Sequence, residues 1–301
     1  MEPLISVVTP TFNIIKYNRQ KYFEQLCDSI LNQSYKNIEH IIIDGNSDDG
    51  TLELIKNHMK NCRGKYLSAT DSGIYDAFNK GVNLASGKYV IFMGTDDYFY
   101  DSAVVSKVVL KLEETEADFS YGDVYLLNET RPEKSRVAKG NLHELFFKMS
   151  FCHQSVFMRR DVLQKFPFNT DYRISADYDL CLKLLMLRAN IVRVNEIISV
   201  FRTGGASSNT ELFDLERLSV FKNRLSLNDK EALKLLKYKI LPLRKVKEYA
   251  KFFTGNEYFY YYVAVMKYFI HYLRSNIIQI RTSKGKESFV LLGKEFVKRK
   301  V

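Results

Sequence analysis

The stretch ISVVTPTFN, residues 5–13, decides the fold, because a β-branched run passes directly into a polar turn. Two later runs have the same character, HIIID at residues 40–44 and YVIFM at residues 89–93. Short continuous apolar runs are typical of parallel strands that are buried on both faces. We therefore predict strands at Ile5–Thr9, His40–Asp44 and Tyr89–Met93, with Lys65–Ser68 as a weaker fourth.

Helical patterns separate these strands. Apolar residues recur at helical spacing in Gln20–Gln33 and in Ile74–Ala85. Between them, Thr51–Met59 follows Asp48 and Asp49, which can cap its start. This alternation predicts an α/β fold with a Rossmann-like, mostly parallel sheet flanked by helices. Ligands of such sheets bind beyond the carboxyl ends of the strands.

After Asp101 the pattern loosens, so we expect one domain over residues 1–210, with halves at 1–101 and 102–210. The elements expected in the second half are a helix at Ser102–Glu116, strands at Phe119–Leu127 and Ser155–Met158, a helix at Tyr178–Arg188 and a strand at Ile191–Phe201. From Glu211 the sequence turns to charged, amphipathic helix. We therefore expect a basic helical extension over residues 211–301.

Charge is concentrated in this tail. Of 45 Lys and Arg and 35 Asp and Glu, 20 basic and 9 acidic residues fall in 211–301. The tail thus has a net charge of +11, and residues 1–210 have a net charge of −1. A neutral body with a basic tail favours a polyanionic surface as partner, either nucleic acid or anionic lipid. A solvated helical face is the alternative.

The tail also holds an aromatic stretch, Tyr258–Leu273, interrupted by Lys267 and His271. It is short for a membrane span, which needs about 18 apolar residues. Amphipathic helices with basic and aromatic faces lie in the membrane interface, so we expect peripheral contact with an anionic membrane. The alternatives are a helical subdomain packed on the body and a homodimer through these helices. The first apolar run, Leu4–Val8, is too short for a signal peptide, which favours a cytoplasmic location.

The four cysteines, Cys27, Cys62, Cys152 and Cys181, form no C-x-x-C pair and have no zinc-like spacing. Cys27 and Cys181 fall on apolar stripes of predicted helices. We expect both to be buried thiols in a reducing compartment.

Polar turns follow the early strands. They are PTFN after the first, DGNSDDG after the second, DSG after the weak strand and GTDD after the last, ending at residues 13, 50, 73 and 97. One such Asp is often a helix cap, but several acids at one sheet edge raise one another's pKa unless a cation compensates. A divalent metal is the simplest compensation. The first turn lacks the glycines of a dinucleotide fingerprint, and no P-loop sequence occurs, which argues against dehydrogenases and P-loop enzymes.

These residues resemble a known motif series. Pro10–Asn13, Asp44–Thr51, Asp71–Gly81, Ala85–Lys88 and Thr95–Asp97 look like the motifs of family 2 glycosyltransferases with the GT-A fold. The resemblance covers roughly residues 3–205, and the later segments Cys152–Phe157 (CHQSVF), Ser175–Leu180 (SADYDL) and Arg202–Ser207 (RTGGAS) also fit it. It implies a nucleotide-sugar-binding half before residue 101 and an acceptor-side half after it.

The resemblance implies a donor site at the turns. Thr11 and Phe12, with Asn13 beside them, would border the base and ribose, and Asp44 would accept a hydrogen bond from the base. Relatives often have two acids where this chain has Asp44-Gly45. The remaining implied contacts are Asp71 near the base and ribose, Asp96 on the ribose, and Asp97 on Mn²⁺ or Mg²⁺ bridging the diphosphate.

For the acceptor, the resemblance implies Asp177 as the general base, with Asp179 as the competing carboxylate. Asp177 can instead cap the helix that follows. Direct displacement assisted by one carboxylate inverts the anomeric carbon. The pair His153-Gln154 would lie near the donor sugar, although a lone histidine is usually structural. Arg202 and the glycine turn after it could contact the diphosphate, or they could simply form a tight connection. Lys80 could contact phosphate, or it could be a solvent-facing lysine.

The expected function is therefore metal-dependent, inverting transfer from a nucleoside-diphosphate sugar, expected to be a UDP-sugar, to a glycan acceptor. By analogy, the acceptor is lipid-linked and serves bacterial surface polysaccharide synthesis at the inner face of the membrane. Two rivals are a sugar nucleotidyltransferase, which would be expected to carry a glycine-rich basic loop after the first strand, and a non-enzymatic nucleic-acid-binding protein using the tail. We favour no nucleic-acid partner.

Overall fold

A computed structural model describes residues 2–204, 210–276, 278–283, 286–291 and 294–298, with side chains up to residue 272. The chain divides into two compact units. The first unit comprises residues 1–142 and 149–216, and the second comprises residues 143–148 and 217–301. The sequence predicted a boundary at residue 210 and did not separate His143–Lys148 from its surroundings.

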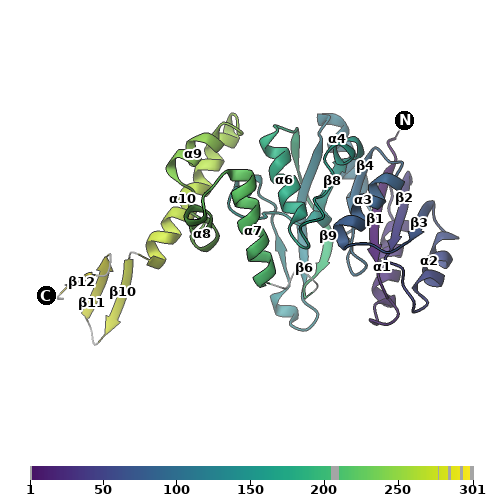
Figure 1. Cartoon of the computed structure of the whole chain (residues 1–301), viewed down its shortest axis with the longest axis horizontal. Helices are drawn as coiled ribbons and strands as arrows, with labels where there is room; N and C mark the ends of the chain where they lie inside the picture. Colours follow the sequence, from purple (N-terminus) through teal and green to yellow (C-terminus); the bar gives the residue numbers. More distant parts are fainter. Residues whose placement is uncertain (1, 205–209, 277, 284–285, 292–293, 299–301) are drawn as a thin grey trace. The chain divides into compact units, whose positions relative to one another are not determined.

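The first unit is built on a sheet whose order is β3-β2-β1-β4-β8-β6-β9-β5, with β7 paired to β6 (Figure 1). The first four strands in this order are parallel. They are β1 Ile5–Thr11, β2 Ile38–Asp44, β3 Gly64–Ser68 and β4 Tyr89–Phe92. Thr11 pairs with Asp44, and Asp44 with Ser68, so three strand ends lie level at one edge.

The rest of the sheet is mixed. Its strands are β5 Tyr98–Phe99, β6 Phe119–Leu127, β7 Arg136–Ala138, β8 Val156–Arg159 and β9 Ile191–Arg202. β6 and β9 are parallel, whereas β8 runs antiparallel to both β4 and β6. β8 therefore joins the parallel half to the remainder of the sheet.

Helices flank this sheet. They are α1 Gln20–Leu31, α2 Thr51–Met59, α3 Ile74–Leu84, α4 Val104–Thr115, α5 Arg160–Lys165 and α6 Ala176–Met186, with short 3-10 helices η1 Pro132–Lys134, η2 Leu142–Glu144 and η3 His153–Ser155. Fully buried strand residues such as Ile5, Val7 and Ile91 form one core with the α4 valines. The predicted α/β architecture is confirmed, because β-branched strands are covered on both faces.

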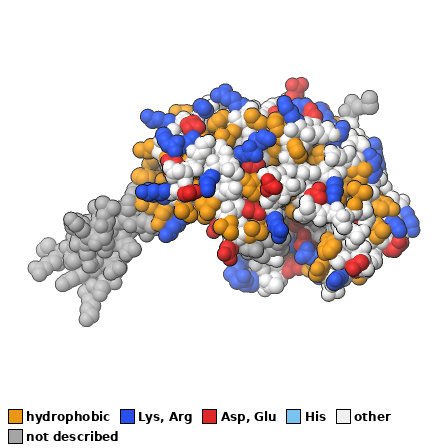
Figure 2. Space-filling view, in the orientation of Figure 1, with side chains coloured by type: hydrophobic (Ala, Val, Ile, Leu, Met, Phe, Trp, Pro, Cys, Tyr) orange, Lys and Arg blue, Asp and Glu red, His pale blue; other side chains and the backbone are white. Residues whose placement is uncertain are grey.

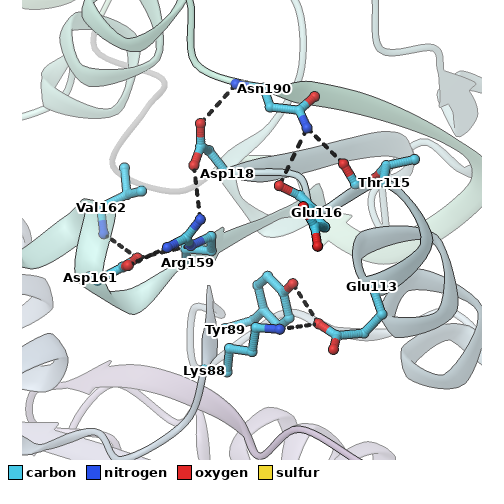
Figure 3. A network of polar contacts seen from close by, with 10 residues as sticks. All are labelled: Lys88, Tyr89, Glu113, Thr115, Glu116, Asp118, Arg159, Asp161, Val162 and Asn190. Atoms are coloured by element: carbon cyan, nitrogen blue, oxygen red, sulfur yellow. Dashed lines mark hydrogen bonds and ion pairs between the residues drawn. The ribbon is translucent and has the colours of Figure 1, made fainter.

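Polar contacts gather around the starts of β4, β6 and β9 (Figure 3). Asp118, before β6, accepts a hydrogen bond from the backbone of Asn190 at 2.8 Å and pairs with Arg159 of β8 at 3.4 Å. Lys88, before β4, reaches Glu113 of α4 at 2.6 Å. These contacts fix loops whose role is structural.

The second unit is mostly helical, as expected, up to residue 276. Its helices are α7 Thr210–Leu225, whose first turns belong to the first unit, α8 Asp229–Tyr238, α9 Leu243–Ala250 and α10 Asn256–Asn276. The end of the tail differs from the helical expectation, because β10 Ile278–Ser283, β11 Lys286–Leu291 and β12 Lys294–Lys298 form an antiparallel sheet. Apolar and polar residues alternate at the start of β10 (IQIRTS), a period typical of strands, whereas β11 (KESFVL) and β12 (KEFVK) do not alternate. None of the helices that the structure describes is long and apolar enough to cross a bilayer.

The core of the second unit is aromatic. Phe146 stacks on Tyr249 with ring centroids 4.5 Å apart, and Tyr261 stacks on Phe253 at 5.0 Å. Such ring pairs add stabilisation beyond the area that they bury. His143–Lys148 therefore belongs to this unit because its aromatic side chains pack there.

Candidate active site

Asp44 ends β2 and is fully buried. Its carboxylate accepts hydrogen bonds from neutral donors of the protein: Thr11 Oγ1 at 3.3 Å, Ser47 N at 3.0 Å, Ser47 Oγ at 2.5 Å and Ser68 Oγ at 2.6 Å. A carboxylate has about four lone-pair sites, so these donors use its acceptor capacity. In this arrangement Asp44 organises the loop after β2, and its contact with a base stays a prediction.

Asn13 joins the loop after β1 to the loop after β2. It lies in the left-handed region with φ 48°, its backbone N–H donates to Ser47 at 2.8 Å, and its side chain accepts from Asp48 N at 3.2 Å. Asp49 accepts from the backbone of Lys16 at 2.6 Å and from Thr51 N at 3.1 Å. The two loops are thus held together as one surface. The cap residue of α2 is Gly50, and not Asp48 or Asp49.

Phe12, Gly45 and Asp71 meet on the open side of these loops. Phe12 is 54% exposed. A Cβ at Gly45 would lie 3.0 Å from Asp71 Oδ2 and 3.2 Å from the Phe12 ring, so a larger residue would push both side chains away. Asp71 Oδ1 accepts from the backbone of Gly73 at 3.0 Å. The contact of this exposed ring and its neighbouring carboxylate with a base and ribose stays a prediction.

Lys80 on α3 is engaged within the protein. Its ammonium donates to Thr70 O at 2.7 Å and pairs with Asp76 at 3.0 Å. It therefore anchors the loop that carries Asp71, and its expected contact with phosphate stays a prediction.

Asp97 follows β4 and is only 1% exposed. Its carboxylate accepts from Gln154 Nε2 at 2.9 Å, from Gly94 N at 3.2 Å and from Arg202 N at 3.3 Å. Burial and the charge of Asp96 raise the pKa of Asp97 to about 6. Asp96 is more open and lies 3.5 Å from the guanidinium of Arg19.

Arg202, at the end of β9, is buried and positions the Asp96–Asp97 turn. Its guanidinium donates to the backbone O of Asp96 and to Glu129 at 2.9 Å, and it lies over the Tyr22 ring at 4.3 Å. The residues around this guanidinium line a small pocket that includes Arg19, Tyr22, Asp96, Glu129 and Thr203. The Gly205–Ser207 part of the expected diphosphate turn lies outside the described residues.

Asp177 lies in the first turn of α6, where Ser175 and not Asp177 is the cap residue. Tyr75 Oη donates to Asp177 Oδ1 at 3.0 Å, and His153 Nδ1 lies 3.1 Å from Oδ2. The Asp177 side chain keeps 14% exposure, whereas Asp179 is buried. The more accessible carboxylate is therefore the one that the resemblance implies.

One short segment links the two acids. In η3, Gln154 donates to Asp97 while His153 contacts Asp177. Burial, then the charges of Asp177 and Asp97, raise the pKa of the Cys152 thiol to about 12, which shows that Cys152 lies near both carboxylates. Sequence reasoning selected the His153-Gln154 pair but gave no role to Tyr75. The signal for Tyr75 was its place inside DSGIYDAFNKG.

A mixed, mostly parallel sheet of this order agrees with the GT-A architecture that the resemblance implies. Residues 6–166, more than half of the chain, match the family model for "Glycosyl transferase family 2". The chain belongs to glycosyl transferase family 2. A "PGL/p-HBAD biosynthesis glycosyltransferase" of Mycobacterium tuberculosis is 30% identical over 240 residues, which cover 78% of this chain and 88% of the relative.

A chondroitin synthase of Escherichia coli is 27% identical over 259 residues, which cover 83% of this chain and 36% of that protein. Among solved structures, S. aureus TarS in complex with UDP-GlcNAc has a TM-score of 0.59 at 14% identity, over 99% of both chains. The mannosyltransferase PcManGT of Pyrobaculum calidifontis, in complex with GDP-Man and Mn²⁺, has a TM-score of 0.55 at 14% identity, over 91% of this chain and 81% of its own. These structures share the fold, and the family decides against the two rival functions.

Proposed function

We propose that this glycosyltransferase moves a sugar from a nucleoside-diphosphate donor to a glycan acceptor with inversion of the anomeric carbon. The observation that carries the proposal is the η3 link, which connects the donor-side acid Asp97 to the candidate base Asp177. Bound donors in the structural neighbours, UDP-GlcNAc in TarS and GDP-Man in PcManGT, support a nucleotide sugar, and we expect a UDP-sugar.

Asp177 would take the proton of the attacking acceptor hydroxyl. Tyr75 and His153 hold one carboxylate oxygen each, which orients the group while leaving it accessible. The acceptor hydroxyl would displace the nucleoside diphosphate in one step, without a covalent sugar–enzyme intermediate. A single displacement inverts the anomeric carbon. His153 and Tyr75 are positioning residues in this mechanism.

Asp97, with Asp96 beside it, would hold Mn²⁺ or Mg²⁺. Carboxylate oxygens are ligands that these hard cations prefer. The residues fit such an ion, because the raised pKa of Asp97 is that of a buried acid beside a like charge, and a cation would relieve the cost of ionising it. The bound ion would supply neutralisation of the departing nucleoside diphosphate.

A donor screen tests this proposal. Release of nucleoside diphosphate is measured for UDP- and GDP-sugars with glycan acceptors, with Mn²⁺ or Mg²⁺ and with a chelator. We expect turnover of a UDP-sugar that stops in chelator, and a product whose anomeric configuration, read by NMR, is inverted. A retained anomer would overturn the single displacement, and full activity in chelator would overturn the metal requirement.

We further propose that the second unit holds the enzyme on an anionic membrane, where the acceptor is lipid-linked. On α10, Phe259, Val263, Met266 and Ile270 recur at helical spacing and are 42–65% exposed. The opposite stripe, which includes Tyr261 and Tyr268, is buried within the unit. Residues 217–272 hold 12 basic and 4 acidic residues, which favours anionic lipid.

Basic side chains are interspersed with acidic and apolar ones on the face drawn in Figure 2. Attachment should therefore combine exposed aromatic residues with dispersed cations, and only the charged part should weaken with salt. Cosedimentation with anionic and zwitterionic liposomes tests this, comparing the wild-type chain with Phe259→Ser/Met266→Ser. The control is Leu110→Ser on α4, which removes a side chain that is 61% exposed in the first unit.

We expect anionic liposomes to bind the wild-type chain and the control, and to bind the double variant more weakly. Equal binding of all three would exclude α10 as the attachment surface. A shift of the double variant from dimer to monomer in sedimentation, without any lipid binding, would favour the homodimer instead. A chain ending at Thr210 is a poorer test, because it would leave the aromatic side chains of 143–148 without their partners.

A further inference from the structure

A cluster of sulfur and imidazole groups lies inside the first unit, and the catalytic proposal uses none of its side chains. Cys27 on α1, His40 on β2 and His58 on α2 place one ligand atom each within 4.8 Å of one another. Cys62, just after α2, adds a second sulfur 3.4 Å from His58 Nε2. We propose that Cys27, His40, His58 and Cys62 form a structural zinc site.

His58 Nε2 is the focus of the cluster. His40 Nδ1 lies 2.8 Å from it, and Cys62 Sγ lies 3.4 Å from it. One imidazole nitrogen carries either a single proton or a single lone pair, so a hydrogen bond satisfies only one of these neighbours. Two nitrogens of a tetrahedral zinc site lie about 3.3 Å apart, given Zn–N bonds of about 2.0 Å. A separation of the rings by roughly 0.5 Å would therefore give these two nitrogens the spacing of zinc ligands.

The surroundings of His40 match those of a metal-bound histidine. Its other nitrogen, Nε2, lies 2.9 Å from Thr9 Oγ1 on β1. When Nε2–H donates to this hydroxyl, Nδ1 keeps its lone pair for a metal. A hydrogen bond from the second ring nitrogen is the outer contact that orients histidine ligands.

The donor atoms select the metal. Thiolate sulfur with imidazole nitrogen suits zinc, whereas the carboxylates at Asp97 suit Mn²⁺ or Mg²⁺. Two thiolates would also balance the charge of Zn²⁺ in a buried place. The spacing of the cysteines gives no hint of this, because the four ligands come from α1, β2, α2 and the bend that follows α2.

The site would clamp elements that carry the donor loops. His40 stands four residues before Asp44 on β2, and His58 is on the helix that begins after the Asp44–Thr51 loop. Binding of zinc to the folded chain alone would raise its melting temperature, as for any ligand that prefers the native state. The clamp would act on stability and not on the chemical step.

The test measures metal directly on the purified full chain. Zinc content is determined by plasma mass spectrometry, and zinc is replaced by Co²⁺ to look for thiolate-to-cobalt charge transfer in the near ultraviolet. The matched variants are Cys27→Ser and Cys62→Ser. Cys181→Ser removes a buried thiol on α6, and Asp97→Asn removes the oxygen-donor acid, so both are controls.

We expect about one zinc per wild-type chain, retained in both controls and lost from both cysteine variants. A chelator that removes it should lower the melting temperature of the wild-type chain. A wild-type chain that takes up no zinc and shows no charge-transfer band would overturn the proposal, and so would full retention in either cysteine variant. Because the wild-type result alone can overturn it, a variant that fails to fold leaves the test intact.

Discussion

Asp44 and Asp177 are both carboxylates that the sequence placed in the active site, yet the protein holds them differently. Asp44 is fully buried, and protein donors fill its acceptor sites. Asp177 has two side-chain partners and keeps 14% exposure. A saturated carboxylate stabilises the fold, whereas a partly open one is available to a substrate. The comparison therefore predicts that the two acids fail in different ways when they are changed.

The largest expected effect is that of Asp177→Asn. We expect kcat to fall by about 10²–10⁴-fold, because general-base catalysis is lost, while donor KM and melting temperature stay near wild type. Steady-state kinetics and thermal unfolding measure these quantities. The control is Asp179→Asn, which changes the buried acid on the same helix. If Asp179→Asn is inactive while Asp177→Asn remains within a few-fold of wild type, the base has been assigned to the wrong carboxylate.

Asp97 combines features of both acids. It is as buried as Asp44, and yet we propose that it binds a metal ion. Asp97→Ala should abolish metal-dependent binding of UDP, and Asp97→Asn should weaken it, measured by titration calorimetry with Mn²⁺. Gln154→Leu should weaken it by about 10–100-fold, the usual effect of losing a partner of a metal ligand. Unchanged UDP affinity in Asp97→Ala would remove this residue from the metal site.

The parts of the fold that were predicted correctly depend on local patterns. Phe119–Leu127 and Thr51–Met59 were placed at the observed residues, because a short segment rich in aromatic and aliphatic residues and a helical period are visible without tertiary contacts. The acidic turns were found for the same reason, since each directly follows its strand. The tail strands from Ile278 onward were missed because the helical pattern before them was extended to the end of the chain.

What the sequence could not give is the set of partners. The contact of Tyr75 with Asp177 joins residues 102 positions apart, and that of Gln154 with Asp97 joins residues 57 positions apart. His143–Lys148 was assigned to the catalytic half because nothing local shows that Phe146 packs on Tyr249. The gathering of Cys27, His40 and His58 is likewise a consequence of tertiary structure. The sequence shows which acids are present, but it does not show how many hydrogen-bond donors surround each acid or how deeply each acid is buried.

Asp44→Asn should destabilise the first unit. The new amide NH₂ would face N–H and O–H donors of the loop that now donate to the carboxylate. At least one buried hydrogen bond would be lost and its donor left unsatisfied, which costs about 1–3 kcal/mol. For a unit of this size each kcal/mol corresponds to about 2–4 °C in melting temperature. Calorimetry should therefore show a fall of several degrees. A variant as stable as wild type that cannot bind donor would instead place Asp44 in contact with the base.

The pH dependence of stability is expected to depend on Glu144 of the second unit. This carboxylate is buried and accepts hydrogen bonds from Lys267 Nζ and Tyr268 Oη, each at 2.6 Å, with Lys148 3.0 Å away. Burial disfavours its charge, but these donors outweigh burial and lower the pKa of Glu144 to about 2. It resembles Asp44 in burial and differs in having cationic partners.

The direction of the pH effect follows from this lowered pKa. An unfolded glutamate has a pKa of about 4.3, so the ionised group stabilises the folded unit above that pH, and the stabilisation is lost as pH falls from about 4 to about 2. The two pKa values set an upper limit of about 3 kcal/mol. Glu144→Gln should remove most of this acid sensitivity, whereas Glu248→Gln, which changes a partly exposed partner of Lys245, should leave it. Urea unfolding followed by tyrosine fluorescence at pH 6 and pH 3 measures the difference. If wild type and Glu144→Gln lose equal stability between these pH values, the cationic partners do not hold this carboxylate in the folded state, and α10 is fixed by its aromatic contacts alone.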